Sequence, residues 1–242
     1  MRIMVYGDSN SWGYLDEEDG LREPRRFEGR WPVVMARALT GHLAKASPQA
    51  GSGLVRAVEL VEECLPGRTT DVDDPLRGAC MNGAGPLEAL LLSHTPLDLI
   101  LLMLGTNDLK VRYERNPAQI VGGMMALSDT IAGLDYWPNV GPLASRPRLA
   151  VICPPALGLR VDQPGYRFHE DWIGGRDKSL ALPGLVAAAC EQRGLAFFDA
   201  NQAVASSECD PIHWTRDSHC AFGAAMAEWV ARAGLLSTTE AG

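Results

Sequence analysis

Three polar residues in this sequence have the types and spacing of a nucleophile, an orienting acid and a general base. Ser9 follows the apolar residues 3–6 within the segment Gly-Asp-Ser, whereas Asp210 and His213 lie three positions apart near the other end of the chain. With that spacing one short loop can hold both side chains, with the carboxylate on imidazole Nδ1 and Nε2 free to face a serine. Because a serine hydroxyl is a weak nucleophile by itself, this grouping predicts base-assisted attack on an acyl carbon.

Acyl transfer also requires hydrogen-bond donors for the charge that develops on the carbonyl oxygen. The sequence offers the backbone N–H of Ser9, the backbone N–H of Gly67 in a Pro-Gly-Arg turn, and the side-chain amide of Asn107 in Gly-Thr-Asn-Asp. Two of these residues have an alternative structural interpretation, Gly67 as an ordinary turn glycine and Asn107 as a helix N-cap. Asn107 is compatible with both roles.

The residues around Ser9 are candidates for a substrate pocket, namely Asp8, Asn10, Trp12 and Tyr14. For Asp8 we favour hydrogen-bonding support of the loop over the role of a second catalytic acid. The two aromatic side chains are equally compatible with a position in the core.

These side chains would meet if the chain formed an open parallel α/β sheet, because the carboxyl ends of its strands share one edge. The strongest strand pattern is the apolar run 97–104, as expected for a central strand buried on both faces. The other predicted strands are 3–6, 54–61, 148–153 and 195–198, and the predicted helices are 31–39, 86–93, 116–131, 182–192 and a last one that begins near Ser218.

The segments between these elements are predicted to be loops, including 16–26, 45–53, 71–82 and a long irregular segment at 156–178. A loop as long as the last one usually acts as a lid or a partner surface. Strand and helix alternate without repeats or a linker, which predicts a single domain over residues 1–242. The expected fold class is α/β, a three-layer α/β/α domain around a five-stranded parallel sheet.

Composition and charge exclude several classes of protein. Lys and Arg number 22 against 30 Asp and Glu, a net charge of −8 that argues against nucleic-acid or anionic-membrane partners. No apolar segment is long enough to span a bilayer, and the first residues lack the pattern of a signal peptide. The six cysteines are scattered, so we interpret them as reduced thiols of a cytoplasmic protein.

No metal or organic cofactor is expected. A zinc site at the cysteines is disfavoured because they form no close ligand pair, and the other conceivable metal cluster is Asp217, His219 and Cys220 together with His213. It is disfavoured because His219 opens a helix and no pair of ligands lies on one face.

Taken together, the blocks around Ser9, Gly67, Asn107 and His213 resemble the SGNH (GDSL-type) hydrolase family, block by block and over essentially the whole chain. More narrowly they are similar to its bacterial arylesterase/acyltransferase branch, which shares Gly-Asp-Ser-x-Ser-Trp-Gly, Arg-Thr-Thr at 68–70 and Leu-Gly-Thr-Asn-Asp at 104–108. The resemblance implies a flavodoxin-like SGNH-hydrolase fold and a homo-oligomer. One departure is Asn10, which stands where the family name expects Leu.

Carried over by this resemblance, Ser9 is the nucleophile, His213 the base and Asp210 its orienter. Ser9, Gly67 and Asn107 are then the oxyanion hole. The implied activity is that of a serine esterase acting on small acyl or aryl esters, by hydrolysis or by transfer of the acyl group to an alcohol. A carbohydrate O-acetylesterase and a non-catalytic small-ligand module are the alternatives.

Overall fold

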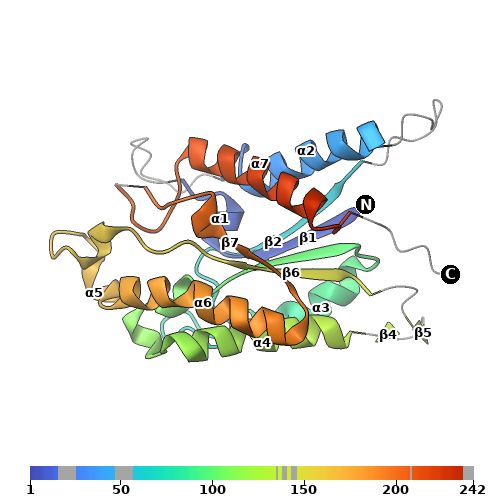
Figure 1. Ribbon diagram of the computed structural model, residues 1–242. Helices are drawn as coiled ribbons and strands as arrows, with labels where there is room; N and C mark the ends of the chain where they lie inside the picture. The colour runs from blue at the N-terminus through green and yellow to red at the C-terminus, as the bar shows by residue number, and fades with distance from the viewer. Residues whose placement is uncertain are drawn as a thin grey trace.

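The computed structural model describes residues 1–15, 26–46, 57–134, 136–137, 141–142, 146–207 and 209–236, and the predictions for 16–25, 47–53 and the start of the 54–61 strand lie outside these ranges. Its main sheet contains five parallel strands in the order β2-β1-β3-β6-β7 (Figure 1). The strands are β1 (Arg2–Gly7), β2 (Glu59–Cys64), β3 (Leu99–Met103), β6 (Arg148–Cys153) and β7 (Ala196–Asp199). The predicted fold class is confirmed.

Helices cover both faces of this sheet (Figure 1). One layer consists of α2 (Trp31–Ala46) and α7 (Arg216–Arg232), which pack against each other. The opposite layer consists of α3 (Ala84–His94), α4 (Pro117–Gly133) and α6 (Gly175–Arg193), with α4 in contact with both of the others. The result is the three-layer arrangement that the alternation of strands and helices predicts.

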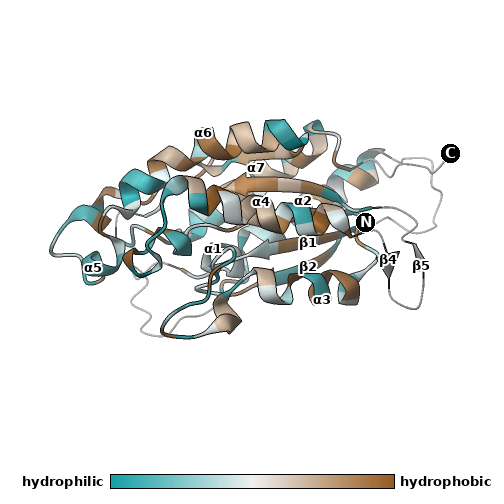
Figure 2. Ribbon diagram, turned by 90° about the horizontal axis from the view of Figure 1, so that it is seen from below, coloured by the Kyte–Doolittle hydropathy of each residue, from teal (hydrophilic) through white to brown (hydrophobic). Residues whose placement is uncertain are grey.

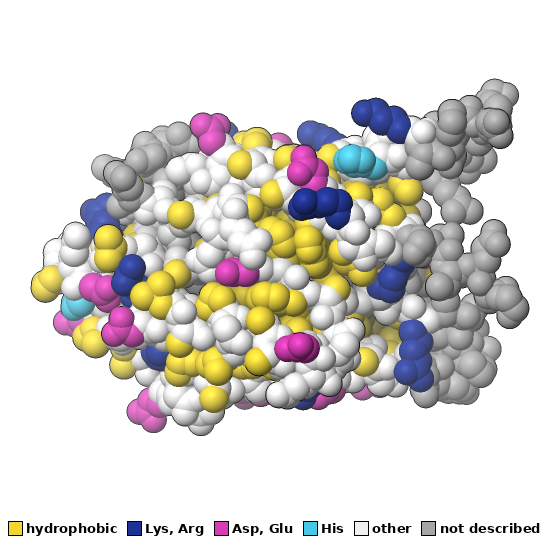
Figure 3. All heavy atoms as spheres, in the orientation of Figure 1, with side chains coloured by type: hydrophobic (Ala, Val, Ile, Leu, Met, Phe, Trp, Pro, Cys, Tyr) yellow, Lys and Arg dark blue, Asp and Glu magenta, His cyan; other side chains and the backbone are white. Residues whose placement is uncertain are grey.

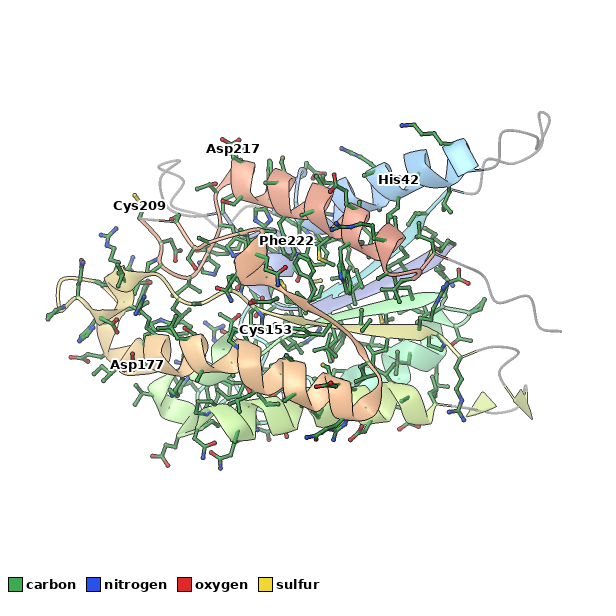
Figure 4. The ribbon with its side chains drawn as sticks, in the orientation of Figure 1. His42, Cys153, Asp177, Cys209, Asp217 and Phe222 are labelled. Carbon is green, nitrogen blue, oxygen red and sulfur yellow. The ribbon has the colours of Figure 1, made fainter. Side chains whose placement is uncertain are left out.

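Alternate side chains of β1 pack against the two helix layers, because successive side chains of a strand point to opposite faces of the sheet. Ile3 and Val5 belong to the cluster that contains Trp31 of α2 and Phe222 of α7. Met4 and neighbouring Tyr6 belong to the cluster on the other face, which includes residues of α3 and α4. Figure 2, seen from the side of α3, α4 and α6, shows the hydrophobic colour of β1, and Figure 4 shows Phe222 beneath α7. β1 is thereby fixed from both sides at the centre of the fold.

Short elements fill the connections. They are α1 (Ser9–Trp12), α5 (His169–Trp172), the two-residue strands β4 (Tyr136–Trp137) and β5 (Gly141–Pro142), and the 3₁₀ turns Ala79–Met81, Asn107–Leu109, Val111–Tyr113, Leu159–Asp162 and Ala200–Gln202. The helix predicted at 182–192 begins seven residues earlier, so the irregular segment is shorter than predicted and contains α5. Likewise α2 continues beyond its predicted end at Leu39 to Ala46.

Apolar side chains are exposed on one face of the molecule. On the face seen in Figure 3, hydrophobic side chains gather across the middle, where Leu180 and Leu185 of α6 are exposed. Within the described ranges, no helix combines the length and apolar character needed to cross a bilayer. The six cysteines are present as thiols.

Two adjacent glycines of α4 offer a matched test of how this helix supports the loop after β2. A Cβ at Gly123 would lie 2.3 Å from both Thr70 Oγ1 and Asp71 Oδ1, whereas a Cβ at Gly122 meets nothing within 4 Å. We expect Gly122→Ala to stabilise the protein by up to about 1 kcal/mol through helix propensity. Gly123→Ala should destabilise it by about 1–3 kcal/mol through overpacking. Urea unfolding of both variants measures the difference, and equal effects would contradict the close approach of α4 to this loop.

Candidate active site

The turn after β1 presents Ser9 at the carboxyl edge of the sheet. Asp8 is in an extended conformation and caps α1, with its Oδ1 accepting a 3.0 Å hydrogen bond from the Asn10 N–H. This cap stops the strand and starts the helix at Ser9 within two residues. Gly7 allows the turn to close, because a Cβ there would lie 2.4 Å from Ser11 Oγ. The nucleophile candidate is therefore held by a short, tightly packed turn.

Asp210 and His213 meet Ser9 in the predicted geometry. His213 Nε2 lies 3.1 Å from Ser9 Oγ, and His213 Nδ1 lies 2.6 Å from Asp210 Oδ2. The other carboxylate oxygen, Asp210 Oδ1, accepts the backbone N–H groups of Ile212 at 2.9 Å and His213 at 3.1 Å. A carboxylate on Nδ1 fixes the tautomer in which Nε2 can accept the serine proton.

The negative charge of Asp210 is stabilised beside the imidazole of His213. Burial favours the neutral carboxyl, but the hydrogen bond from His213, its charge and the backbone N–H groups of Ile212 and His213 outweigh burial and hold the pKa of Asp210 below its usual range. Asp210 consequently remains an anion beside the imidazole. An anion there stabilises the imidazolium that forms when His213 takes a proton.

The loop that carries His213 is tied to the turn that carries Ser9. Asn10 Nδ2 donates a 3.1 Å hydrogen bond to the carbonyl of Ile212, and the Asn10 side chain is fully buried. On the other side of the loop, Gly158 N–H donates to the Pro211 carbonyl at 2.8 Å. Asn10 therefore links the turn that carries Ser9 to the loop that carries His213, and the sequence alone did not indicate this contact.

Tyr14 contacts two histidines in this region, His213 through its ring and His219 through its carbonyl, and the sequence indicated neither contact. The ring of Tyr14 stacks on that of His213, with centroids 4.2 Å apart and planes 30° from parallel. The Tyr14 carbonyl is 3.3 Å from Nε2 of His219, which is fully buried at the start of α7. The Tyr14 ring therefore covers one face of the His213 imidazole. Trp12 is partly buried and has the guanidinium of Arg26 5.8 Å from its ring centre.

Gly67 and Asn107 lie on the loops that follow β2 and β3, the two neighbours of β1. Leu65 to Arg68 form a β-turn closed by a 3.0 Å hydrogen bond from Arg68 N–H to the Leu65 carbonyl, with Gly67 at φ +92°. This φ at the third turn position favours glycine, and Pro66 suits the second position. Within the described part of the chain, the N–H groups of Ser9 and Gly67 have no hydrogen-bond partner, so both are available to a ligand.

The Asn107 side chain is held at both ends. Its Nδ2 donates a 3.0 Å hydrogen bond to the Arg68 carbonyl, and its Oδ1 accepts a 2.8 Å hydrogen bond from Lys110 Nζ. One Nδ2 hydrogen remains, because an amide nitrogen carries two donors. Asn107 also begins a 3₁₀ turn but does not cap it with its side chain. The N-cap alternative is therefore excluded, and the amide is oriented by contacts on both of its atoms.

A buried ion network joins the loops that carry Gly67 and Asn107. Asp108 is fully buried and accepts hydrogen bonds from Thr70 N–H at 3.1 Å, Thr70 Oγ1 at 2.6 Å and Arg115 at 2.9 Å. Arg115 also pairs with Asp71. A buried charge is tolerated only with such partners. The network fixes the distance between the two loops. The sequence alone assigned no role to Asp108, so it did not predict this network.

The carboxyl group of Asp8 lies beneath the site with little exposure. Burial raises its pKa to about 6, against the opposing hydrogen bond from Asn10 and the positive charges of His213 and Lys110. Within the described residues, no cluster of three or more His, Cys, Asp or Glu could hold a metal ion, and Asp217 points away from the sheet (Figure 4).

Comparison with known proteins reveals close structural likeness to esterases. No family model matches the chain, and no curated protein matches it. The structure of Est24, a carbohydrate acetylesterase from Sinorhizobium meliloti, is 31% identical with a TM-score of 0.81, covering 96% of this chain and 99% of that one. The aryl esterase of M. smegmatis is 33% identical with a TM-score of 0.80, covering 96% and 98%. The lipase/acylhydrolase of Enterococcus faecalis, at 16% identity and a TM-score of 0.60, shares the fold.

The hydrogen bond from Asn10 to the Ile212 carbonyl leads to a prediction about stability. We expect Asn10→Leu to leave the Ile212 carbonyl without its donor and to loosen the loop that holds His213. The cost should be about 1–3 kcal/mol in stability. Asn10→Asp keeps the shape of the side chain but removes the donor, so we expect this variant to be less stable as well. Thermal unfolding with and without an active-site phosphonate measures the effect; a wild-type melting temperature for Asn10→Leu would contradict the bridging role.

Buried His219 makes stability depend on pH. Burial lowers its pKa to about 4 from an ordinary value near 6.5. Because the folded state resists protonation, stability is fully present above pH 6.5 and falls as the pH drops towards 4. The loss attributable to this residue approaches about 3 kcal/mol. His219→Gln should flatten that part of the curve, whereas His42→Gln, on the exposed side of α2, should not. Urea unfolding across pH 4–8 compares the slopes, and parallel curves for wild type and His219→Gln would overturn the assignment.

Proposed function

The chain belongs to the SGNH (GDSL-type) hydrolase family, and from that premise we propose that it is a serine carboxylic ester hydrolase. One observation carries the proposal, the continuous hydrogen-bonded series from Ser9 Oγ through His213 to Asp210, with spacings of 3.1 and 2.6 Å. Free backbone donors stand beside the serine. No other group of described residues combines a nucleophile, a base and donors in this way.

In the proposed first step, Ser9 Oγ attacks the ester carbonyl carbon while its proton passes to His213 Nε2. A C–O bond forms and the carbonyl electron pair moves onto oxygen, giving a tetrahedral oxyanion. When the oxyanion collapses, the bond to the leaving alkoxide breaks and His213 returns the proton to it. The products are an acyl-enzyme on Ser9 and a free alcohol or phenol.

The oxyanion is the species that the donors are expected to stabilise. The N–H groups of Ser9 and Gly67 and the remaining hydrogen of Asn107 Nδ2 belong to rigid turns, so they need not reorganise during the reaction. Each donor of this kind contributes about 3 kcal/mol to lowering the barrier. The support for Gly67 is its unpartnered N–H, and the support for Asn107 is its fixed amide.

The acyl-enzyme is released by the same steps in reverse. Water, deprotonated by His213, attacks the acyl carbon and gives the carboxylic acid and free Ser9. An alcohol in place of water gives a new ester, which is the transfer reaction. Both routes use the same groups of the chain, namely Ser9, His213, Asp210 and the oxyanion donors, and differ only in whether water or an alcohol attacks.

A carbohydrate O-acetylesterase remains a second candidate, favoured by the likeness to Est24, which matches about as well as the aryl esterase does. The two activities share the chemistry at Ser9 and differ in the leaving group, a sugar hydroxyl against a phenol. Parallel assays on p-nitrophenyl acetate and on acetylated xylan, with and without an added alcohol, separate them and report transfer. The homo-oligomer implied by the resemblance also stays a proposal.

Removal of the nucleophile is the direct test. Ser9→Ala should abolish ester cleavage and labelling by an alkyl phosphonate, while near-UV circular dichroism stays unchanged. The matched control is Ser11→Ala in the same short helix, because the Ser11 hydroxyl is buried and has no partner among the described residues. The loss should be at least about 1,000-fold in kcat. Turnover retained by Ser9→Ala, or a label found on another residue by peptide mass spectrometry, would overturn the assignment of Ser9 as the nucleophile, whereas a wild type that shows neither turnover nor labelling would favour the non-catalytic ligand module.

A further inference from the structure

Lys110 is a half-buried cation that contacts Asn107, and the mechanism above does not use it. Its Nζ donates a 2.8 Å hydrogen bond to Asn107 Oδ1 and lies 5.0 Å from the ring centre of Trp172. Lys110 directly follows the 3₁₀ turn that begins at Asn107, and its N–H donates to the Asn107 carbonyl at 3.2 Å. Main chain and side chain of Lys110 therefore both contact the same asparagine.

The contact matters because an asparagine amide has two orientations that differ only in which atom points where. In the observed orientation, Oδ1 faces the ammonium and Nδ2 faces the Arg68 carbonyl. The flipped orientation would place an NH₂ group against the ammonium and an oxygen against a carbonyl, two repulsive contacts. The charge of Lys110 thus selects the orientation that leaves an Nδ2 hydrogen for the oxyanion.

The surroundings of Lys110 let its charge change near neutral pH. Burial, together with the positive charges of Arg112 and Arg77, lowers its pKa to about 8, and the negative charges of Asp171 and Asp74 oppose the shift. Asp8, on the turn beneath Ser9, is a further carboxyl that feels this charge. Lys110 loses its proton as the pH rises past about 8, and the Asn107 amide then loses the charge that favours its observed orientation and is held by the Arg68 carbonyl alone.

We propose that Lys110 is a positioning residue for ester cleavage, whose ammonium holds the Asn107 amide in the donor orientation and adds positive charge beside the oxyanion. The proposal rests on the proposed esterase function. Lys110 contacts Asn107 and not Ser9, so it acts through the asparagine. Its effect should therefore appear in kcat, because the oxyanion exists only in and around the transition state.

Three variants test this role. Lys110→Met keeps an unbranched chain over Trp172 but removes the charge, and we expect kcat on p-nitrophenyl acetate to fall about tenfold to a hundredfold with KM nearly unchanged. Lys110→Arg keeps a donor and the charge and should recover most of that loss. Lys45→Met, at the exposed end of α2, is the control for removing a lysine and should match the wild type. Melting temperatures show that each variant is folded.

The pH profile gives the readout that a merely structural lysine would not move. Wild-type kcat, corrected with Ser9→Ala for spontaneous hydrolysis, should decline on the alkaline side around pH 8. Arginine stays protonated above pH 12, so Lys110→Arg should keep its rate to higher pH. Lys110→Met should lack the decline and remain slow throughout.

The results separate failure of this inference from failure of the esterase function. If the wild type cleaves esters and Ser9→Ala does not, the esterase function holds, and wild-type kcat in Lys110→Met would then overturn the inference. An alkaline decline at the same pH in Lys110→Arg would also overturn it. Absence of ester cleavage by the wild type would instead remove the proposed function on which it rests.

Discussion

The hydrogen bond between Ser9 Oγ and His213 Nε2 is the contact on which the rest of the structure depends. It spans 3.1 Å and joins residues 204 positions apart, one after a central strand and the other after the edge strand β7. β6 and β3 lie between these strands in the sheet, so the loop after β7 must cross the carboxyl edge to reach Ser9. A misplacement of about 1 Å at such a contact is costly for catalysis, so the crossing loop must be fixed.

The structure fixes that loop with hydrogen bonds to backbone groups. Gly158 N–H and Arg160 bind the carbonyls of Pro211 and Cys209, and Asn10 binds that of Ile212. Each bond satisfies a carbonyl that the crossing loop cannot pair within a strand or helix, and leaving such a group buried without a partner costs about 1–3 kcal/mol. The irregular segment after β6 is therefore a platform for the base.

Sequence reasoning succeeded where one local pattern determines the outcome. β3 and β6 are buried on both faces and read as apolar runs, and the spacing of Asp210 and His213 suits a single loop. β2 begins and ends later than predicted. It is an edge strand that contains Glu59, Glu62 and Glu63, so it lacks the continuous apolar run by which its position could be predicted. α6 was started too late because its first turns are polar and Pro183, a residue typical of helix starts, lies inside it.

Contacts between distant loops carry no such pattern, and the orientation of the Asn107 amide shows why they matter. The sequence identifies an asparagine after a strand, but whether its side chain presents a donor or an acceptor depends on the Arg68 carbonyl 39 positions away and on the charge of Lys110. The same buried region holds Asp8, whose pKa burial raises, and Asp210, whose pKa its partners lower. Burial strengthens each of these interactions, because few water molecules compete with them. The polarity of the site is thus a property of several loops held at fixed distances by the sheet, and a single motif can supply only one member of it.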